Sequence, residues 1–187
     1  GAIYLTGMGF IGGIVQEDNF ALNENKESSD CTNLVDGAPK GQGILAFENP
    51  YCRGNIANAG GGGNAMMSGG GGGANGGQGG DGGKQNSGAS IPTTTTWGLG
   101  GAPTSNSLLE RVNLGGGGGA GQKIGAITWG GDGSWGGGIL ILFARNIQQN
   151  QGTFGSIEAN GMNGVPATNN NSDDIGTSQG AGGGGGG

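Results

Sequence analysis

The chain has 187 residues, of which 53 are glycine, whereas only 32% are hydrophobic and 5% are aromatic. Glycine has no side chain to bury and loses the most backbone entropy on folding, so this composition argues against an ordinary packed core. Histidine is absent, which removes the commonest general base and metal ligand, and we expect no enzyme. The net charge is −6 and the seven basic residues are scattered, so we expect no nucleic-acid partner.

The first predicted strand covers residues 2–6, and its sequence returns near the end of the chain. The opening Ile3-Tyr4-Leu5-Thr6-Gly7-Met8-Gly9 is matched at residues 157–163, where isoleucine, glycine and methionine recur at the same spacing. The match is either a true repeat or an accident of a biased composition.

Gly7, Gly9 and Gly12 follow this strand and fit the G-x-G-x-x-G fingerprint of dinucleotide-binding proteins. That fingerprint has meaning only within a strand–turn–helix unit, and residues 12–18 are a poor helix start. The spacing also arises by chance in a chain so rich in glycine. We therefore expect no nucleotide site.

The two cysteines, Cys31 and Cys52, flank a turn-rich segment. In an exported protein, a disulfide between them would restrain the acidic insertion and contribute about 3 kcal/mol in the chain-entropy model. Two free thiols are the alternative. Neither cysteine has a histidine to activate it, so thiol catalysis is not expected.

The glycine tracts at residues 60–63, 69–73, 115–119 and 182–187 are the most informative feature of the chain. In NGGQGGDGGK (75–84) the polar residues fall at every third position, which is the period of a polyproline-II-type helix. Five prolines are too few for collagen. The pattern instead predicts polyglycine-II helices that pack side by side and pair their amide groups, with a disordered linker as the alternative.

Calcium near Asp81 is a further hypothesis, because residues 76–81 match the start of the G-G-x-G-x-D calcium repeat. No tandem copy follows to supply facing ligands. The default interpretation is a solvated polar edge, with no cofactor.

Three further strands are predicted at residues 124–129, 139–147 and 153–159. The run ILILFARNI (139–147) is continuous and apolar at its start, which is typical of a strand buried on both faces. It is far too short to span a bilayer, so no membrane insertion is expected. Helix signals are weak, and the best of them, at residues 107–112, also fits a strand.

Each of the three tryptophans, Trp97, Trp129 and Trp135, lies next to glycine. Their rings either cap the ends of glycine tracts, where little other apolar bulk is present, or stack on a sugar or a partner surface. Candidate contact regions are the loops at residues 16–36, 93–97 and 166–174.

Four blocks carry a resemblance to a known family: RGNIANAGGGGN (53–64), SGGGGGANGGQGGDGG (68–83), GDGSWGGGILILFARNIQ (131–148) and GSIEANGMNG (155–164). Their order resembles the glycine-rich domains of large adhesin-like surface proteins of Bacteroidetes, which are typically exported by the type IX secretion system and some of which are tied to gliding motility. The chain departs from this pattern at residues 64–67 and in the insertion at 16–36. The resemblance implies an extracellular, cell-surface location and supplies no catalytic residues.

Together these features predict one glycine-rich domain over residues 1–187, cut from a longer surface protein. Its fold class would be mainly β and irregular, with short solenoid-like strands, packed polyglycine-II helices and almost no α-helix. The expected function is structural and adhesive: a rigid stalk or tip whose loops contact a surface glycan or another cell-surface ligand. The alternatives are a lectin-like glycan-binding module that uses the tryptophans, and a cargo segment recognised by outer-membrane secretion or motility components.

Overall fold

The computed structural model describes residues 1–15, 37–46, 50–63, 68–83, 97–104, 111–122, 128–148, 152, 155–165 and 168–169. Within these ranges the chain contains no α-helix and four short strands, namely β1 (Ala2–Tyr4), β2 (Thr128–Trp129), β3 (Ser156–Glu158) and β4 (Thr168–Asn169). The expectation of a mostly irregular, non-helical chain is therefore confirmed for the described part. The predicted helix or strand at 107–112 lies largely outside it.

The strands form two separate pairs. β1 and β3 are parallel, with Ile3 opposite Ile157, and β2 and β4 are antiparallel, with Trp129 opposite Thr168. The predicted strands at 2–6, 124–129 and 153–159 each contain one of these elements. In the parallel pair, residue n lies opposite residue n + 154, which is the offset of the sequence repeat.

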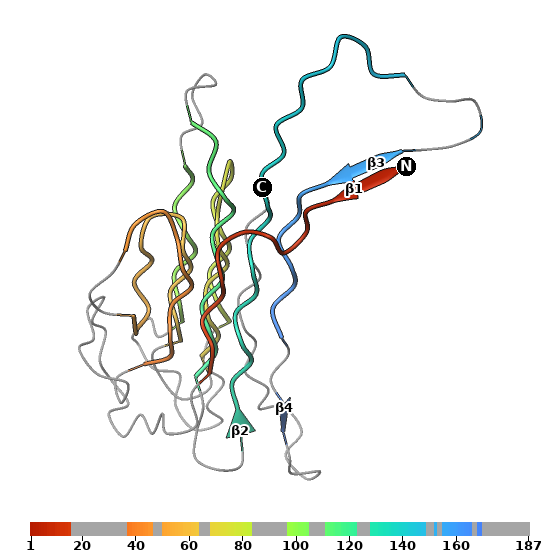
Figure 1. Cartoon of the computed structure of the whole chain (residues 1–187). Coiled ribbons are helices and arrows are strands. Elements are labelled where there is room, and N and C mark those ends of the chain that lie inside the picture. Colours follow the sequence, from red (N-terminus) through yellow and green to blue (C-terminus); the bar gives the residue numbers. More distant parts are fainter. Residues whose placement is uncertain are drawn as a thin grey trace.

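Most of the described chain consists of extended segments that run side by side as a bundle (Figure 1). The central one comprises residues 115–122, and every residue in it is buried. Every third backbone amide of this central segment, starting at Gly115, donates to a carbonyl of the segment at 130–138. The bonds run from Gly115 to Gly137, from Gly118 to Ser134 and from Gly121 to Gly131. Donors therefore return to the same neighbour every third residue, and the neighbour runs antiparallel.

The remaining amides of the central segment follow the same rule with two other neighbours. One series donates to residues 68–75, in bonds from Gly116 to Ala74, from Gly119 to Gly71 and from Gln122 to Ser68. The other donates to residues 38–42, in bonds from Gly117 to Gln42 and from Ala120 to Pro39. Three successive amides thus point to three different segments, as a backbone with three residues per turn requires.

Carbonyl groups of the central segment accept from two more neighbours, which run parallel to it. Phe10 and Gly13 donate to Gly115 and Gly118, and Gly60 and Gly63 donate to Gly117 and Ala120. Five described segments consequently surround this one, and buried peptide groups find partners in different directions rather than within one flat sheet.

Close approach of these segments explains why so many positions are glycine. A Cβ atom built on Gly119 would lie 2.0 Å from the carbonyl oxygen of Gly61, and one on Gly117 would lie 2.1 Å from that of Ile11. Real Cβ atoms do not come so near to backbone atoms, so a side chain at either position would push two segments apart. Glycine is required here by contact distance and not by a positive φ, which only Gly7 and Gly152 show among the described glycines.

The segment at residues 77–83 lies at the edge of the bundle and shows the three-residue period in its burial. Gly79 and Gly82 face backbone of neighbouring segments, whereas Gly76, Gly77, Gly80 and Gly83 have open space around them. Gln78 and Asp81 are exposed. One edge of this segment therefore packs, and the polar residues lie on solvent-facing edges.

The interior of the described part holds almost no apolar side chain of any size. Its buried hydrophobic residues are four alanines and one cysteine, namely Ala38, Cys52, Ala59, Ala74 and Ala120. Hydrogen-bonded backbone fills the space that leucine and valine occupy in ordinary domains.

The prediction of a buried strand at residues 139–147 is wrong. No strand is assigned there, residues 141–148 are exposed, and the side chain of Phe143 is 94% exposed. In Figure 1 this stretch leaves the top of the bundle and leads back towards β3. The apolar run signalled burial, but the bundle ends with the three buried glycines before it, and the chain beyond residue 140 lies outside the packed backbone. No helix in the described ranges has the length and hydropathy needed to cross a membrane.

Candidate functional site

The cysteines predicted to form a disulfide are described only in part. Cys52 is fully buried and has a φ of 77°, an unusual value for a residue other than glycine. Its amide donates to Ala38 and its carbonyl accepts from Gly62, so its backbone belongs to the bundle. Cys31 lies outside the described residues, and the pairing of the two cysteines stays a prediction.

Trp97 lies beside Asp81, the residue considered for calcium. The indole Nε1 donates to Asp81 Oδ2 at 3.4 Å, and the amide of Gly100 donates to Asp81 Oδ1 at 2.9 Å. Both carboxylate oxygens thus accept hydrogen bonds from the protein. No group of three acidic, cysteine or histidine side chains suited to a metal is found within the described ranges.

Trp135 is 48% exposed, and its carbonyl accepts from the amide of Met162 at 2.9 Å. Its segment, 130–138, bonds to the central segment and to residues 9–13, whereas the segment of Trp97, 97–104, bonds to residues 53–83. Trp129 lies in β2 at the far end of the bundle from β1 and β3 (Figure 1). The two segments that carry Trp97 and Trp135 share no backbone hydrogen bond, and each tryptophan belongs to a different group of neighbours.

The glycines of the G-x-G-x-x-G match serve packing. A Cβ on Gly9 would meet backbone of Gly136 and Gly137, and a Cβ on Gly12 would meet the carbonyl of Gly133. Residues 9–13 are extended and bonded to neighbouring segments, so the helix that would bind a pyrophosphate is not present at this position.

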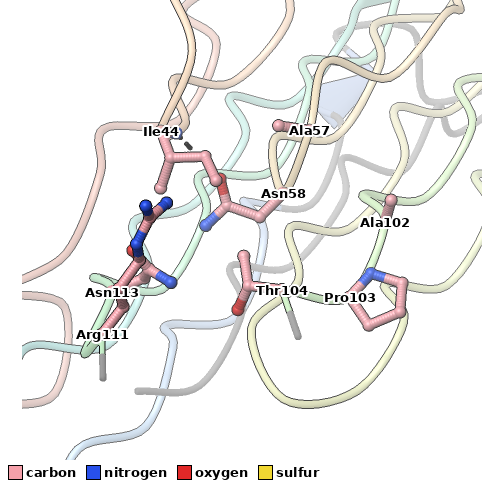
Figure 2. A pocket seen from close by; sticks show the side chains of 8 residues that line it. All are labelled: Ile44, Ala57, Asn58, Ala102, Pro103, Thr104, Arg111 and Asn113. Atoms are coloured by element: carbon pink, nitrogen blue, oxygen red, sulfur yellow. Dashed lines mark hydrogen bonds between the residues drawn. The ribbon is translucent and has the colours of Figure 1, made fainter. Parts of the chain in front are cut away.

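A hollow of about 390 Å³ lined by described residues is a candidate for a binding site. Four segments meet there, and Figure 2 shows the side chains that line it: Ile44, Ala57, Asn58, Ala102, Pro103, Thr104, Arg111 and Asn113. Its lining mixes small apolar groups with amide, hydroxyl and guanidinium groups. That combination suits a small polar ligand.

The floor of this hollow is held by Asn58, a fully buried residue. Its Oδ1 accepts from the amide of Ile44 at 2.9 Å, and its Nδ2 donates to the carbonyl of Leu114 at 3.0 Å. Asn58 therefore joins two segments that share the hollow. Before it, Ala57 adopts a φ of 49°, and the amide of Ala59 closes a tight turn onto the carbonyl of Ile56.

A second set of hydrogen bonds fixes the wall. Thr104 Oγ1 donates to Asn75, whose Oδ1 lies 2.9 Å away, and Asn75 Nδ2 donates to the carbonyl of Asn113 at 3.2 Å. Arg111 lies two residues before Asn113 and is exposed. In Figure 2 the side chains of Arg111 and Asn113 lie on the opposite side of the hollow from Ala102 and Pro103.

Chemically, this hollow offers a guanidinium group and polar side chains above a rigid floor. A guanidinium has five N–H donors and matches a carboxylate in planar, two-point geometry. Sequence reasoning did not single out Asn58 or Arg111, because each is an isolated polar residue and the four segments approach only in the fold.

The predicted contact loops at 16–36, 93–97 and 166–174 lie almost wholly outside the described residues, apart from Trp97 and β4. The chain matches no protein-family model, no curated protein and no solved structure.

Proposed function

We propose that this chain is an extracellular structural and adhesive module, a rigid stalk or tip of a surface adhesin, built of packed polyglycine-II helices. The observation that carries the proposal is the hydrogen bonding of residues 115–122, whose successive amides donate to three different neighbours with a period of three. This is the pattern expected for polyglycine-II helices packed laterally. The resemblance to glycine-rich Bacteroidetes surface proteins supports the location and the adhesive role.

Such a bundle suits a mechanical role for a physical reason. Its segments approach at backbone distance, and each is bonded to several others, so a force on one segment is distributed over many peptide hydrogen bonds. Exposed apolar and aromatic groups such as Phe143 and Trp135 remain available at the surface for contact.

The backbone conformation is tested by solution NMR on the intact chain. We expect φ near −75° and ψ near +145° for residues 115–122, together with through-hydrogen-bond couplings from the Gly115 amide to the Gly137 carbonyl carbon. Random-coil shifts or absent couplings in this segment would contradict the polyglycine-II part of the proposal.

The adhesive role is tested by coating beads with the folded chain and measuring their retention on cell surfaces under flow. We expect retention by the wild-type chain and loss after substitution of Phe143 and Trp135 by serine, with unchanged circular dichroism. A chain that is folded but not retained on any surface, and that co-purifies with an outer-membrane translocon, would favour the cargo function.

The hollow of Figure 2 favours a second candidate function, binding of a glycan that carries a carboxylate. Arg111 supplies the positive charge for such a group, in a chain whose net charge is −6. On a glycan array we expect preference for uronic or sialic acids, lost in Arg111→Ala and retained in Trp135→Ala. The reverse dependence would favour stacking on the tryptophan.

A further inference from the structure

The repeated sequence and the strand pairing coincide in this molecule. Ile3 and Ile157 are equivalent in the sequence repeat, and they are also directly opposite each other in the parallel pair of β1 and β3. The ladder continues past the strands, since Leu5 donates to Glu158 at 2.7 Å and Gly7 donates to Asn160 at 3.1 Å. Two copies of one motif are therefore stacked in register.

Within one chain, the outer edge of β3 is equivalent, through the sequence repeat, to the edge of β1 that faces β3. Peptide groups of successive residues in a strand point to opposite edges. Because the carbonyls of Glu158 and Asn160 point towards β1 and the residues after it, the amides of Ala159 and Gly161 point away from β1. These two residues are the repeat equivalents of Leu5 and Gly7, the donors within the existing pair.

Both edges of this sheet are open among the described residues. The outward amides of Tyr4 and Ala159 donate no backbone hydrogen bond to any described residue. Tyr4 is 61% exposed and Ile157 is 55% exposed. Parallel sheets are normally covered on both faces, and a sheet of only two strands is marginally stable by itself. The unpaired N–H and C=O groups on a free strand edge are a template for another strand.

We infer that the outer edge of β3 receives β1 of a second copy of this chain, in parallel and with the register already used inside the molecule. The amide of Ala159 then donates to the carbonyl of Tyr4 in the second copy, as Leu5 donates to Glu158 within one chain. Since the two edges involved are different, the contact is head-to-tail. Each added copy is displaced along the hydrogen-bonding direction of the sheet and again presents a free β3 edge, so the contact generates linear assemblies. The inference goes beyond the proposed function and is independent of any surface ligand.

The experiment uses two proline variants of the full chain, each of which removes one outward amide. Ala159→Pro blocks the donor edge of β3 and keeps β1 intact, whereas Tyr4→Pro blocks the outer edge of β1 and keeps β3 intact. Mass is measured against concentration by sedimentation velocity. We expect species larger than dimers for the wild-type chain at high concentration, and at least about tenfold weaker association for either variant alone.

Mixing the two variants is the decisive measurement. The intact β3 edge of Tyr4→Pro and the intact β1 edge of Ala159→Pro are complementary, so the mixture should form a one-to-one dimer that grows no further. This outcome also shows that both variants are folded. A wild-type chain that stays monomeric up to about 1 mM would overturn the inference, as would variants that associate like the wild type or a mixture that forms no dimer.

Discussion

Gly79 and Gly80 are adjacent residues whose surroundings differ sharply. A Cβ on Gly79 would lie 2.2 Å from the carbonyl oxygen of Gly72, whereas a Cβ on Gly80 would meet nothing within 4 Å. We expect Gly79→Ala to destabilise the chain by about 2–3 kcal/mol, because a segment must move to admit the methyl group. Gly80→Ala should stabilise it by about 0.4–1 kcal/mol, since alanine restricts the unfolded chain.

Urea unfolding of the two variants measures both changes against the same wild type. Both substitutions change glycine to alanine at adjacent positions, so the backbone preference of alanine contributes about equally to the two. The difference between them then reports the distance from the new Cβ atom to the neighbouring backbone. Equal effects of the two alanines would show that these segments are not packed at backbone distance.

Asn58 and Gln122 are both fully buried amides, and they differ in their partners. Asn58 bonds to Ile44 and Leu114, whereas Nε2 and Oε1 of Gln122 have no hydrogen-bond partner. Replacing Asn58 by leucine removes two hydrogen bonds and leaves the Ile44 amide and the Leu114 carbonyl without this partner, so we expect a loss of about 1–3 kcal/mol. Replacing Gln122 by leucine removes unsatisfied groups and should be neutral or stabilising.

Thermal unfolding monitored by circular dichroism ranks the two leucine variants. The prediction requires the midpoint of Asn58→Leu to fall clearly below that of Gln122→Leu. The opposite order would mean that the Gln122 amide is satisfied and the Asn58 bridges are dispensable.

At the scale of elements, the central segment and the apolar run have opposite environments. The amides of residues 115–122 are buried and bonded, whereas residues 141–148 are exposed. We expect hydrogen exchange at 115–122 to be slower than at 141–148 by about a thousandfold or more, because exchange of the former requires opening of the bundle. Mass spectrometry of peptic fragments resolves the two regions, and similar rates in both would contradict a packed centre.

For the whole molecule, the scarcity of buried apolar side chains has a calorimetric consequence. Unfolding exposes apolar surface, which raises the heat capacity, and polar surface, which lowers it. Since the buried hydrophobic residues described are alanines and a cysteine, peptide groups dominate the newly exposed surface. We expect a heat-capacity change below about 12 cal/mol/K per residue in differential scanning calorimetry, and a value near 15 would indicate an ordinary hydrophobic core.

Much of this arrangement was predictable from residue types. The glycine content argued against a conventional core, as observed in the described part. The three-residue spacing in NGGQGGDGGK predicted a solvated polar edge, which holds for Gln78 and Asp81, whereas Asn75 is buried. Of the two glycine edges expected to pack, only the one with Gly79 and Gly82 meets neighbouring backbone. The strand predicted at residues 2–6 from its alternating side chains contains β1. The segment that repeats its sequence, at residues 157–163, begins in β3, the strand with which β1 pairs.

The apolar run at 139–147 misled because hydrophobicity reports a tendency to be buried and does not reveal which surface is available. In this fold the interior is filled by backbone, so long side chains such as Phe143 are excluded from it. The hollow around Asn58 and Arg111 was also beyond reach, since its lining comes from four separate parts of the chain.

The sequence by itself determined that backbone contacts replace apolar packing, because glycine leaves no other material to bury. It also carried the register of the parallel pair, since the repeat spacing and the strand offset are the same. Only the tertiary structure decided which segments neighbour one another and in which direction they run. Glycine tracts are nearly identical in sequence, so they cannot by themselves distinguish partners. Polar residues beside the tracts, such as Asn58 and Asn75, make the contacts that are specific to one neighbour.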